Sequence, residues 1–410
     1  MNLWTGLYIF KEASFALIKA MKKISYLFIG LFLLSGTSLR AERVLVRFYS
    51  ELIELDYDKS VLPRQELKIN SQAISRLYAQ LERSAHQSLL QGLQDQQQQL
   101  QLNDWLFFKL CQQATRQIYK NRKKQEQLLF IWFLLNQSGL DARITLRDEE
   151  VFLCVYTQEK IFDVPLIKLD EKTFVNISEI GNEAYDDGPV YLLDFIPNPR
   201  GRSFSFSLRN MPKFKPEIEQ KYIRFQFLDS LYHWPVQVDR SYIQLMKDYP
   251  FIDETEYVRA PMSTPLLNSL LPQIKNSIKD MDTQLSVQFL VNFTRSAFKY
   301  MEDKEFFGKS KPMIPDEVLH YPVSDCEDRS ALFYALIEHT LELPMILIAY
   351  PDHLSVGVYL PHVLGETIYY QGKKYLYCDP TGPDNSLEIG QIPKDLRGSP
   401  YEIIHAFPGN

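Results

Sequence analysis

Residues 323–338 read VSDCEDRSALFYALIE, which places a lone cysteine among charged neighbours at the head of an apolar helical repeat. Ser324 or Asp325 can cap a helix that begins at Cys326. The sulfur then lies in the first turn, beside unpaired backbone N–H groups and the positive end of the helix dipole, a position that favours the thiolate. The neighbouring carboxylates oppose that effect. A basic partner elsewhere in the chain is therefore expected.

Two strand patterns follow this helix, each with a polar residue at one end. His353 opens HLSVGVYLP, and Asp379 comes directly after KKYLYC. A histidine at the start of a strand can take a proton from Cys326 and return it to a leaving group, while a carboxylate orients the imidazole. Alternation along the second strand sets Cys378 on the other face, where we expect a buried structural residue. Each residue alone is more often structural, but the ordered set predicts a triad of Cys326, His353 and Asp379.

These segments resemble the transglutaminase-like superfamily of cysteine enzymes. The likeness rests on SDCEDRSALFYALIEHTLELP, DHLSVGVYL and GKKYLYCDPTG, and it covers roughly residues 265–390. The resemblance implies an α+β fold of papain-like type, in which the catalytic cysteine lies at a helix N-terminus packed on an antiparallel sheet. It also implies that Cys326 is the nucleophile, His353 the base and Asp379 the orienting acid.

The N-terminal region has the pattern of a secretory signal peptide. Met21 is followed by two lysines, by the apolar run ISYLFIGLFLL and by a small residue at Ala41. Such a run is too short to span a bilayer, which takes about 20 residues. We expect residues 1–41 to be an upstream extension and signal peptide, and the mature protein to be extracytoplasmic (periplasmic or secreted) and not integral to the membrane. An uncleaved N-terminal anchor is the alternative.

Changes of pattern divide the rest of the chain into three parts. Residues 42–181 carry helix patterns followed by strand patterns, which predicts an N-terminal α+β domain. Residues 182–264 are richer in proline and glycine, and an apolar alternation at 204–208 is typical of a half-buried strand. We interpret them as a β-rich connecting segment. Residues 265–410 hold the triad and form the expected catalytic domain.

The first half of the chain repeats the order of patterns in the second. LLFIWFLLNQSGLDARI (128–144) parallels ALFYALIEHTLELPMIL (331–347), and two strand patterns follow each. In that alignment Lys123 and Ile177 stand at the positions of the cysteine and the aspartate, so the first half would be a degenerate transglutaminase-like copy without the chemistry. Chance similarity of two short apolar helices is an equal alternative.

Composition and spacing exclude several function classes. The formal net charge of −6 argues against a nucleic-acid partner. His362 and His405 lack partners at metal-ligand spacing, and the chain has no glycine-rich phosphate loop, so no metal or cofactor is expected. Four scattered cysteines do not make a disulfide framework, although one bridge is conceivable in an exported protein: Cys111, Cys154, Cys326 and Cys378.

Two functions remain open on this basis. The first is a cysteine peptidase, amidase or acyltransferase that attacks a peptide-like amide of a protein or peptide substrate through a Cys326 thioester, with hydrolysis favoured over cross-linking. Its anionic intermediate needs two hydrogen-bond donors, for which the Cys326 backbone N–H and the Tyr321 side chain are candidates. The second is a non-catalytic protein-binding module that keeps the fold. The intact triad favours the enzyme.

Overall fold

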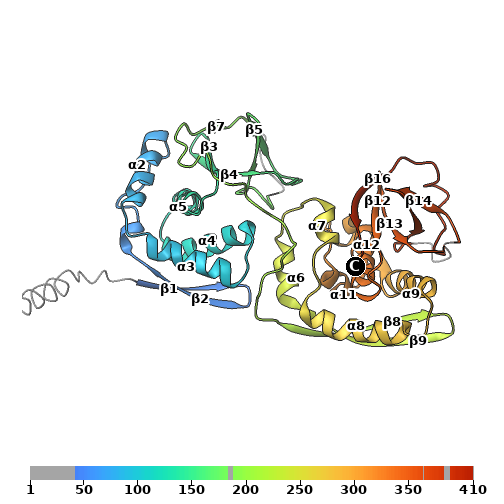
Figure 1. Ribbon diagram of the computed structural model, residues 1–410. Coiled ribbons are helices and arrows are strands. Elements are labelled where there is room, and N and C mark those ends of the chain that lie inside the picture. The colour runs from blue at the N-terminus through green and yellow to red at the C-terminus, as the bar shows by residue number, and fades with distance from the viewer. Residues whose placement is uncertain (1–41, 183–187, 363, 383–387, 410) are drawn as a thin grey trace, which may run out of the picture.

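The computed structural model describes residues 42–182, 188–362, 364–382 and 388–409, and the signal-peptide prediction lies outside them. The fold is of the α+β class, with helices packed on small antiparallel sheets (Figure 1). Within the described residues, no helix has both the length and the apolar character needed to cross a bilayer.

The first part of the chain combines a hairpin, four α-helices and a sheet. Hairpin strands β1 (Glu42–Phe48) and β2 (Glu51–Tyr57) lead through the short 3-10 helix η1 (Lys59–Val61) to α2 (Ser71–Glu82), α3 (Gln87–Gln99), α4 (Asp104–Ile118) and α5 (Lys124–Gln137). The antiparallel sheet has the order β5-β6-β4-β3-β7. Its strands are β3 (Ala142–Arg147), β4 (Glu150–Thr157), β5 (Leu166–Leu169), β6 (Lys172–Asn176) and β7 (Tyr191–Leu192).

The second part begins with a long hairpin and ends in another antiparallel sheet, of order β14-β15-β13-β12-β16. The hairpin is β8 (Ile218–Phe227) and β9 (Ser230–Asp239). Helices α6 (Arg240–Lys247), α7 (Glu254–Val258), α8 (Thr264–Ile278), α9 (Thr283–Ser296), α10 (Asp303–Phe306), α11 (Pro315–His320) and α12 (Cys326–Thr340) follow, with short strands β10 (Lys299–Tyr300) and β11 (Val323–Ser324) between them. The sheet consists of β12 (Met345–Tyr350), β13 (His353–Tyr359), β14 (Thr367–Tyr370), β15 (Lys373–Cys378) and β16 (Glu402–Phe407).

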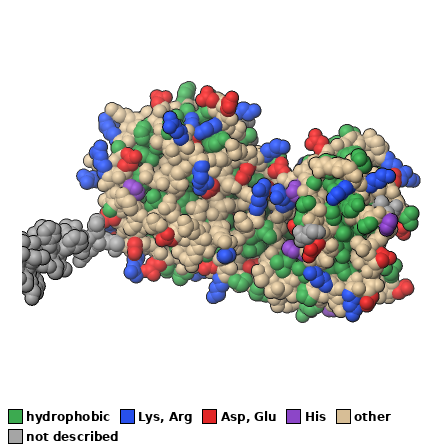
Figure 2. Space-filling view, in the orientation of Figure 1, with side chains coloured by type: hydrophobic (Ala, Val, Ile, Leu, Met, Phe, Trp, Pro, Cys, Tyr) green, Lys and Arg blue, Asp and Glu red, His purple; other side chains and the backbone are tan. Residues whose placement is uncertain are grey.

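Two large hydrophobic clusters hold these parts together. One gathers the hairpin and helices of the first part, and the other packs α8, α9 and α12 between the β8–β9 hairpin and one face of the second sheet. Residues 182–264 contribute to both clusters, with Phe204 in the first and Trp234 in the second. The clusters meet around α6, where Lys and Arg side chains gather on the surface at the junction (Figures 1 and 2).

The two five-stranded sheets share one strand order. In each, a buried helix precedes an antiparallel pair, β3–β4 or β12–β13, and the following pair adds to the same edge. The first hairpin pairs Arg147 with Glu150 as the second pairs Tyr350 with His353, so Glu150 stands at the position of the histidine. If the first half were a degenerate copy of the second, it would have this arrangement. That the two halves share an origin stays a prediction.

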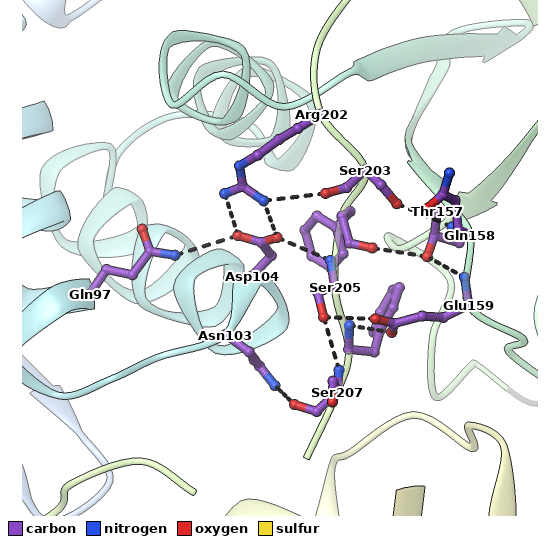
Figure 3. Close-up of polar contacts among 12 residues, drawn as sticks. Gln97, Asn103, Asp104, Thr157, Gln158, Glu159, Arg202, Ser203, Ser205 and Ser207 are labelled. Carbon is purple, nitrogen blue, oxygen red and sulfur yellow. Dashed lines mark hydrogen bonds and ion pairs between the residues drawn. The ribbon is translucent and has the colours of Figure 1, made fainter. Parts of the chain in front are cut away.

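The prediction of a strand at residues 204–208 is wrong, because this segment is not part of a sheet. Its apolar side chains are nevertheless buried, as the alternation requires. The backbone of this segment bonds mainly to side chains rather than to a neighbouring strand (Figure 3). Asp104 accepts from the Ser205 N–H (3.0 Å), and Glu159 accepts from the Phe206 N–H (2.6 Å). Arg202 forms a bidentate pair with Asp104, which fixes the segment to the N-terminus of α4.

Candidate functional site

Cys326 is the first residue of α12, as the capping pattern predicts. Asp325 is the N-cap, and its backbone N–H donates to the Asp328 carboxylate (3.2 Å). Just before the cap, β11 pairs in parallel with β10, which sets Tyr300 opposite Ser324. The cap bond to Asp328 and the pairing of β11 with β10 together fix where the chain enters α12. Cys326 therefore lies at the positive end of the helix dipole.

His353 is the first residue of β13, also as predicted, and the strand is tied to the helix that carries the cysteine. The Ser330 hydroxyl donates to the Leu354 carbonyl (3.0 Å). The backbone N–H of Leu354 lies near enough to the Cys326 thiol to act to lower its pKa. The nucleophile candidate therefore lies beside the residue that follows His353.

Asp379 divides its two carboxylate oxygens between the turn and the histidine. Oδ1 accepts from the backbone N–H (2.9 Å) and the hydroxyl (2.5 Å) of Thr381, and Oδ2 lies 3.3 Å from His353 Nε2. The His353 contact is at ion-pair distance without hydrogen-bond geometry. Burial acts to raise the pKa of Asp379, but His353 and Thr381 outweigh it and hold that pKa below its usual value. The Asp-Pro-Thr motif thus keeps a charged carboxylate against the imidazole.

The Cys326 thiol is not held as a thiolate in this structure, contrary to the expectation from its helix position. It donates to the Glu327 carboxylate (2.9 Å), and no hydrogen bond joins it to His353 in the described part of the chain. Burial and the adjacent Glu327 raise the pKa of Cys326 well above the free-thiol value. These two effects outweigh the helix dipole, so His353 would have to accept the proton during the reaction.

The other three cysteines are buried, and all four are free thiols, so the conceivable disulfide is absent. Cys378 is fully buried, as predicted for a structural residue. Burial raises the pKa of Cys111, Cys154 and Cys378, to about 12 for Cys154. A buried neutral thiol is inert. Cys326 is partly exposed, and it is therefore the cysteine that could react.

Arg329 forms hydrogen bonds to segments that lie next to Cys326 and Asp379 in the chain. Its position in the sequence did not predict this role. It is 1% exposed and donates to the Ser324 hydroxyl (3.0 Å), the Phe298 carbonyl (2.7 Å) and the Thr381 carbonyl. These acceptors lie before α12, after α9 and after Asp379. Burial lowers the pKa of Arg329 to about 10, so the guanidinium remains charged at neutral pH.

Tyr300, which sequence reasoning missed, is the tyrosine that interacts electrostatically with Cys326. Its hydroxyl donates to Glu302 (2.7 Å), and its ring faces the Arg329 guanidinium. Burial and Glu302 raise its pKa, so the phenol stays protonated and can donate. Tyr321, the candidate from sequence, instead packs on Phe307 with ring centroids 5.1 Å apart.

Three carboxylates, two of which flank Cys326 in the chain, lie close together and could hold a cation. Asp303, Asp325 and Glu327 each offer an oxygen within 4.8 Å of the others. Burial raises the pKa of Asp303 to about 7, and burial together with Asp328 raises that of Asp325. Asp325 Oδ1 is buried without a hydrogen-bond partner. Oxygen ligands of this kind suit calcium or magnesium, although no metal was expected from the sequence.

Searches of protein-family models, of curated proteins and of solved structures found no match to this chain. The family likeness therefore depends on the three sequence motifs and the placement of their residues.

Proposed function

We propose that this protein is a transglutaminase-like cysteine enzyme that acts on peptide-like amide bonds outside the cytoplasm, with hydrolysis favoured over cross-linking. The observation that carries the proposal is the convergence of three distant residues. Cys326 begins α12, the Leu354 N–H next to His353 acts on the pKa of its thiol, and Asp379 lies 3.3 Å from His353 Nε2. Few structural needs would bring a thiol, an imidazole and a buried carboxylate together in this order.

In the proposed reaction, Cys326 first leaves its hydrogen bond to Glu327 and gives its proton to His353 Nδ1. The sulfur attacks the amide carbonyl carbon, and the resulting oxyanion accepts from the Cys326 backbone N–H and from Tyr300 once that hydroxyl turns from Glu302. The C–N bond then breaks as His353 protonates the leaving amine. Water hydrolyses the thioester, giving its proton to His353, which returns it to sulfur. An amine in place of water would give a cross-link.

The alternative is a non-catalytic protein-binding module of the same fold. The hydrogen bond between Cys326 and Glu327 favours it, because it holds the thiol in its protonated form and away from His353. An enzyme must break this bond at low cost, whereas a binding module can keep it.

Alkylation of the folded protein distinguishes the two functions. We expect iodoacetamide to label Cys326 well before Cys111, Cys154 and Cys378, because those three are buried whereas Cys326 is partly exposed. Glu327→Gln should increase the Cys326 rate by removing a negative acceptor, and His353→Ala should decrease it. Peptide mapping by mass spectrometry measures the rates. Equal labelling of all four cysteines, or no effect of His353→Ala, would contradict the enzyme.

Divalent cations provide a separate test of the carboxylates. We expect millimolar Ca²⁺ to raise the melting temperature, because a ligand bound only by the folded state at 100 times its Kd adds about 2.7 kcal/mol of stability. Chelation should reverse the effect, and Asp303→Asn should abolish it. Asp56→Asn, an exposed carboxylate of β2, is the matched control. If Ca²⁺ raised the melting temperature of Asp303→Asn as much as that of the wild type, the cation would not bind at this site.

A further inference from the structure

A cleft of about 1140 Å³ lies between the two parts of the molecule. Its walls come from β1, α4 and residues 162–164 of the first part, and from α6 and the loop 309–312 of the second. Drug-sized ligands occupy clefts of about 300–1,000 Å³, so this one has room for a short peptide.

The lining of the cleft is basic, whereas the whole chain carries a net charge of −6. Six cations stand against two carboxylates, Asp163 and Asp248, and one of the six, Lys311, is paired with Glu317. The other five are Arg47, Lys109, Arg116, Lys247 and Lys309. Among the described residues, none of the five forms an ion pair or a side-chain hydrogen bond. Lys and Arg side chains gather at this junction in Figure 2. A concave surface lined by one sign of charge raises the local concentration of the opposite charge.

Aromatic rings line the cleft together with these cations. Phe162 is 43% exposed, and its ring lies 5.1 Å from that of Phe251. Lys109 places its ammonium 5.4 Å from the Trp105 ring. Burial lowers the pKa of Lys109, although the Asp248 carboxylate acts to raise it. A cleft lined by both cations and aromatic rings suits a ligand that carries carboxylates and apolar side chains together.

One wall of the cleft connects with the carboxylates around Cys326. Lys311 lines the cleft, and its backbone N–H donates to Asp303, which belongs to the carboxylate group with Asp325 and Glu327. Lys311 also pairs through its ammonium with Glu317 and covers the Phe307 ring. A ligand in the cleft would therefore contact a segment that is bonded directly to the neighbours of the cysteine.

We propose that this cleft binds an acidic, aromatic-containing segment of the polypeptide substrate, at a distance from the bond that is attacked. The inference rests on the proposed function, which supplies the reason to expect a polypeptide rather than another polyanion. Substrate carboxylates would pair with exposed cations such as Arg116 and Lys247, and apolar side chains would lie against Phe162. The cleft would then select substrates by a sequence feature remote from the reacting amide.

Fluorescence anisotropy with the full chain carrying Cys326→Ala tests this without turnover. The probe is a labelled twelve-residue peptide of alternating glutamate and phenylalanine, compared with an analogue that has glutamine for glutamate. We expect the glutamate peptide to bind at least tenfold more tightly, with an affinity that falls as salt is added. Arg116→Glu with Lys247→Glu should weaken it by tenfold or more. Lys275→Glu, an exposed lysine on α8, is the matched control and should leave binding unchanged.

Three results would overturn the inference: equal binding of the two peptides, unchanged affinity of the double variant, or tighter binding of duplex DNA through the same residues. Melting temperatures of the variants show that they remain folded. Failure of the proposed function is distinguishable, since a protein that binds the peptide in the cleft but whose Cys326 resists alkylation would refute the enzyme alone.

Discussion

Asp379→Asn should lower turnover by about 10³-fold or more, the scale expected when the orienting acid of a triad is neutralised. The asparagine carbonyl can still accept from Thr381, but its amide replaces the charged oxygen that lies 3.3 Å from His353 Nε2. The imidazole then loses support for its cation and can adopt the wrong tautomer. Stability should fall by about 1 kcal/mol or less, because the turn keeps its bonds.

Thr381→Val is the matched control for this change. It removes the hydroxyl that donates to Asp379 Oδ1 but leaves the carboxylate and its contact with His353. We expect a similar small loss of stability with turnover within about tenfold of wild type. Turnover and urea unfolding are measured on the same samples. If the two variants lose turnover equally, Asp379 is a turn residue and its assigned role is wrong.

Arg329→Leu should destabilise the second part of the chain by about 3–5 kcal/mol, the cost of removing one partner from a buried charged group. The change leaves two buried carbonyls, of Phe298 and Thr381, without their donor. It also removes a cation beside Asp325 and Asp328, whose carboxylates interact with it. Denaturant unfolding measures the loss.

Arg329→Lys separates charge from geometry at this position. A lysine keeps the positive charge, but it cannot reach three acceptors from one planar group. We expect an intermediate loss of stability and, in the folded fraction, a reduced turnover, because the Asp379 turn is no longer fixed to α12. Wild-type stability in Arg329→Leu would show that the three bonds do not hold these segments together.

Local patterns predicted the elements that carry the candidate site. Capping residues located the start of α12, and alternation located β13 and the strand before Asp379, because each signal lies within a few residues. The pattern at 204–208 failed for a related reason. Burial alternates there as in a strand, but the hydrogen-bond partners are Asp104 and Glu159, whose distance along the chain hides them.

Long-range contacts account for what the sequence could not predict at the site. Arg329 is one of the charged residues at the head of the apolar helical repeat, and only the tertiary fold brings Phe298 and Thr381 to it. The state of Cys326 also depends on burial and on the orientation of Glu327, neither of which the residue order determines. The cleft requires side chains from β1, α4 and α6 together, and its six cations are scattered along the chain.

The most direct test of the central claim is to trap Cys326 with a peptide that carries an electrophile in place of the attacked amide. A peptide vinyl sulfone library is incubated with wild type, His353→Ala and Asp379→Asn, and the adduct is located by peptide mapping. We predict one adduct per molecule, on Cys326 alone, formed much more slowly in both variants. An adduct that forms equally fast without His353, or the absence of any adduct on Cys326, would contradict the proposed enzyme.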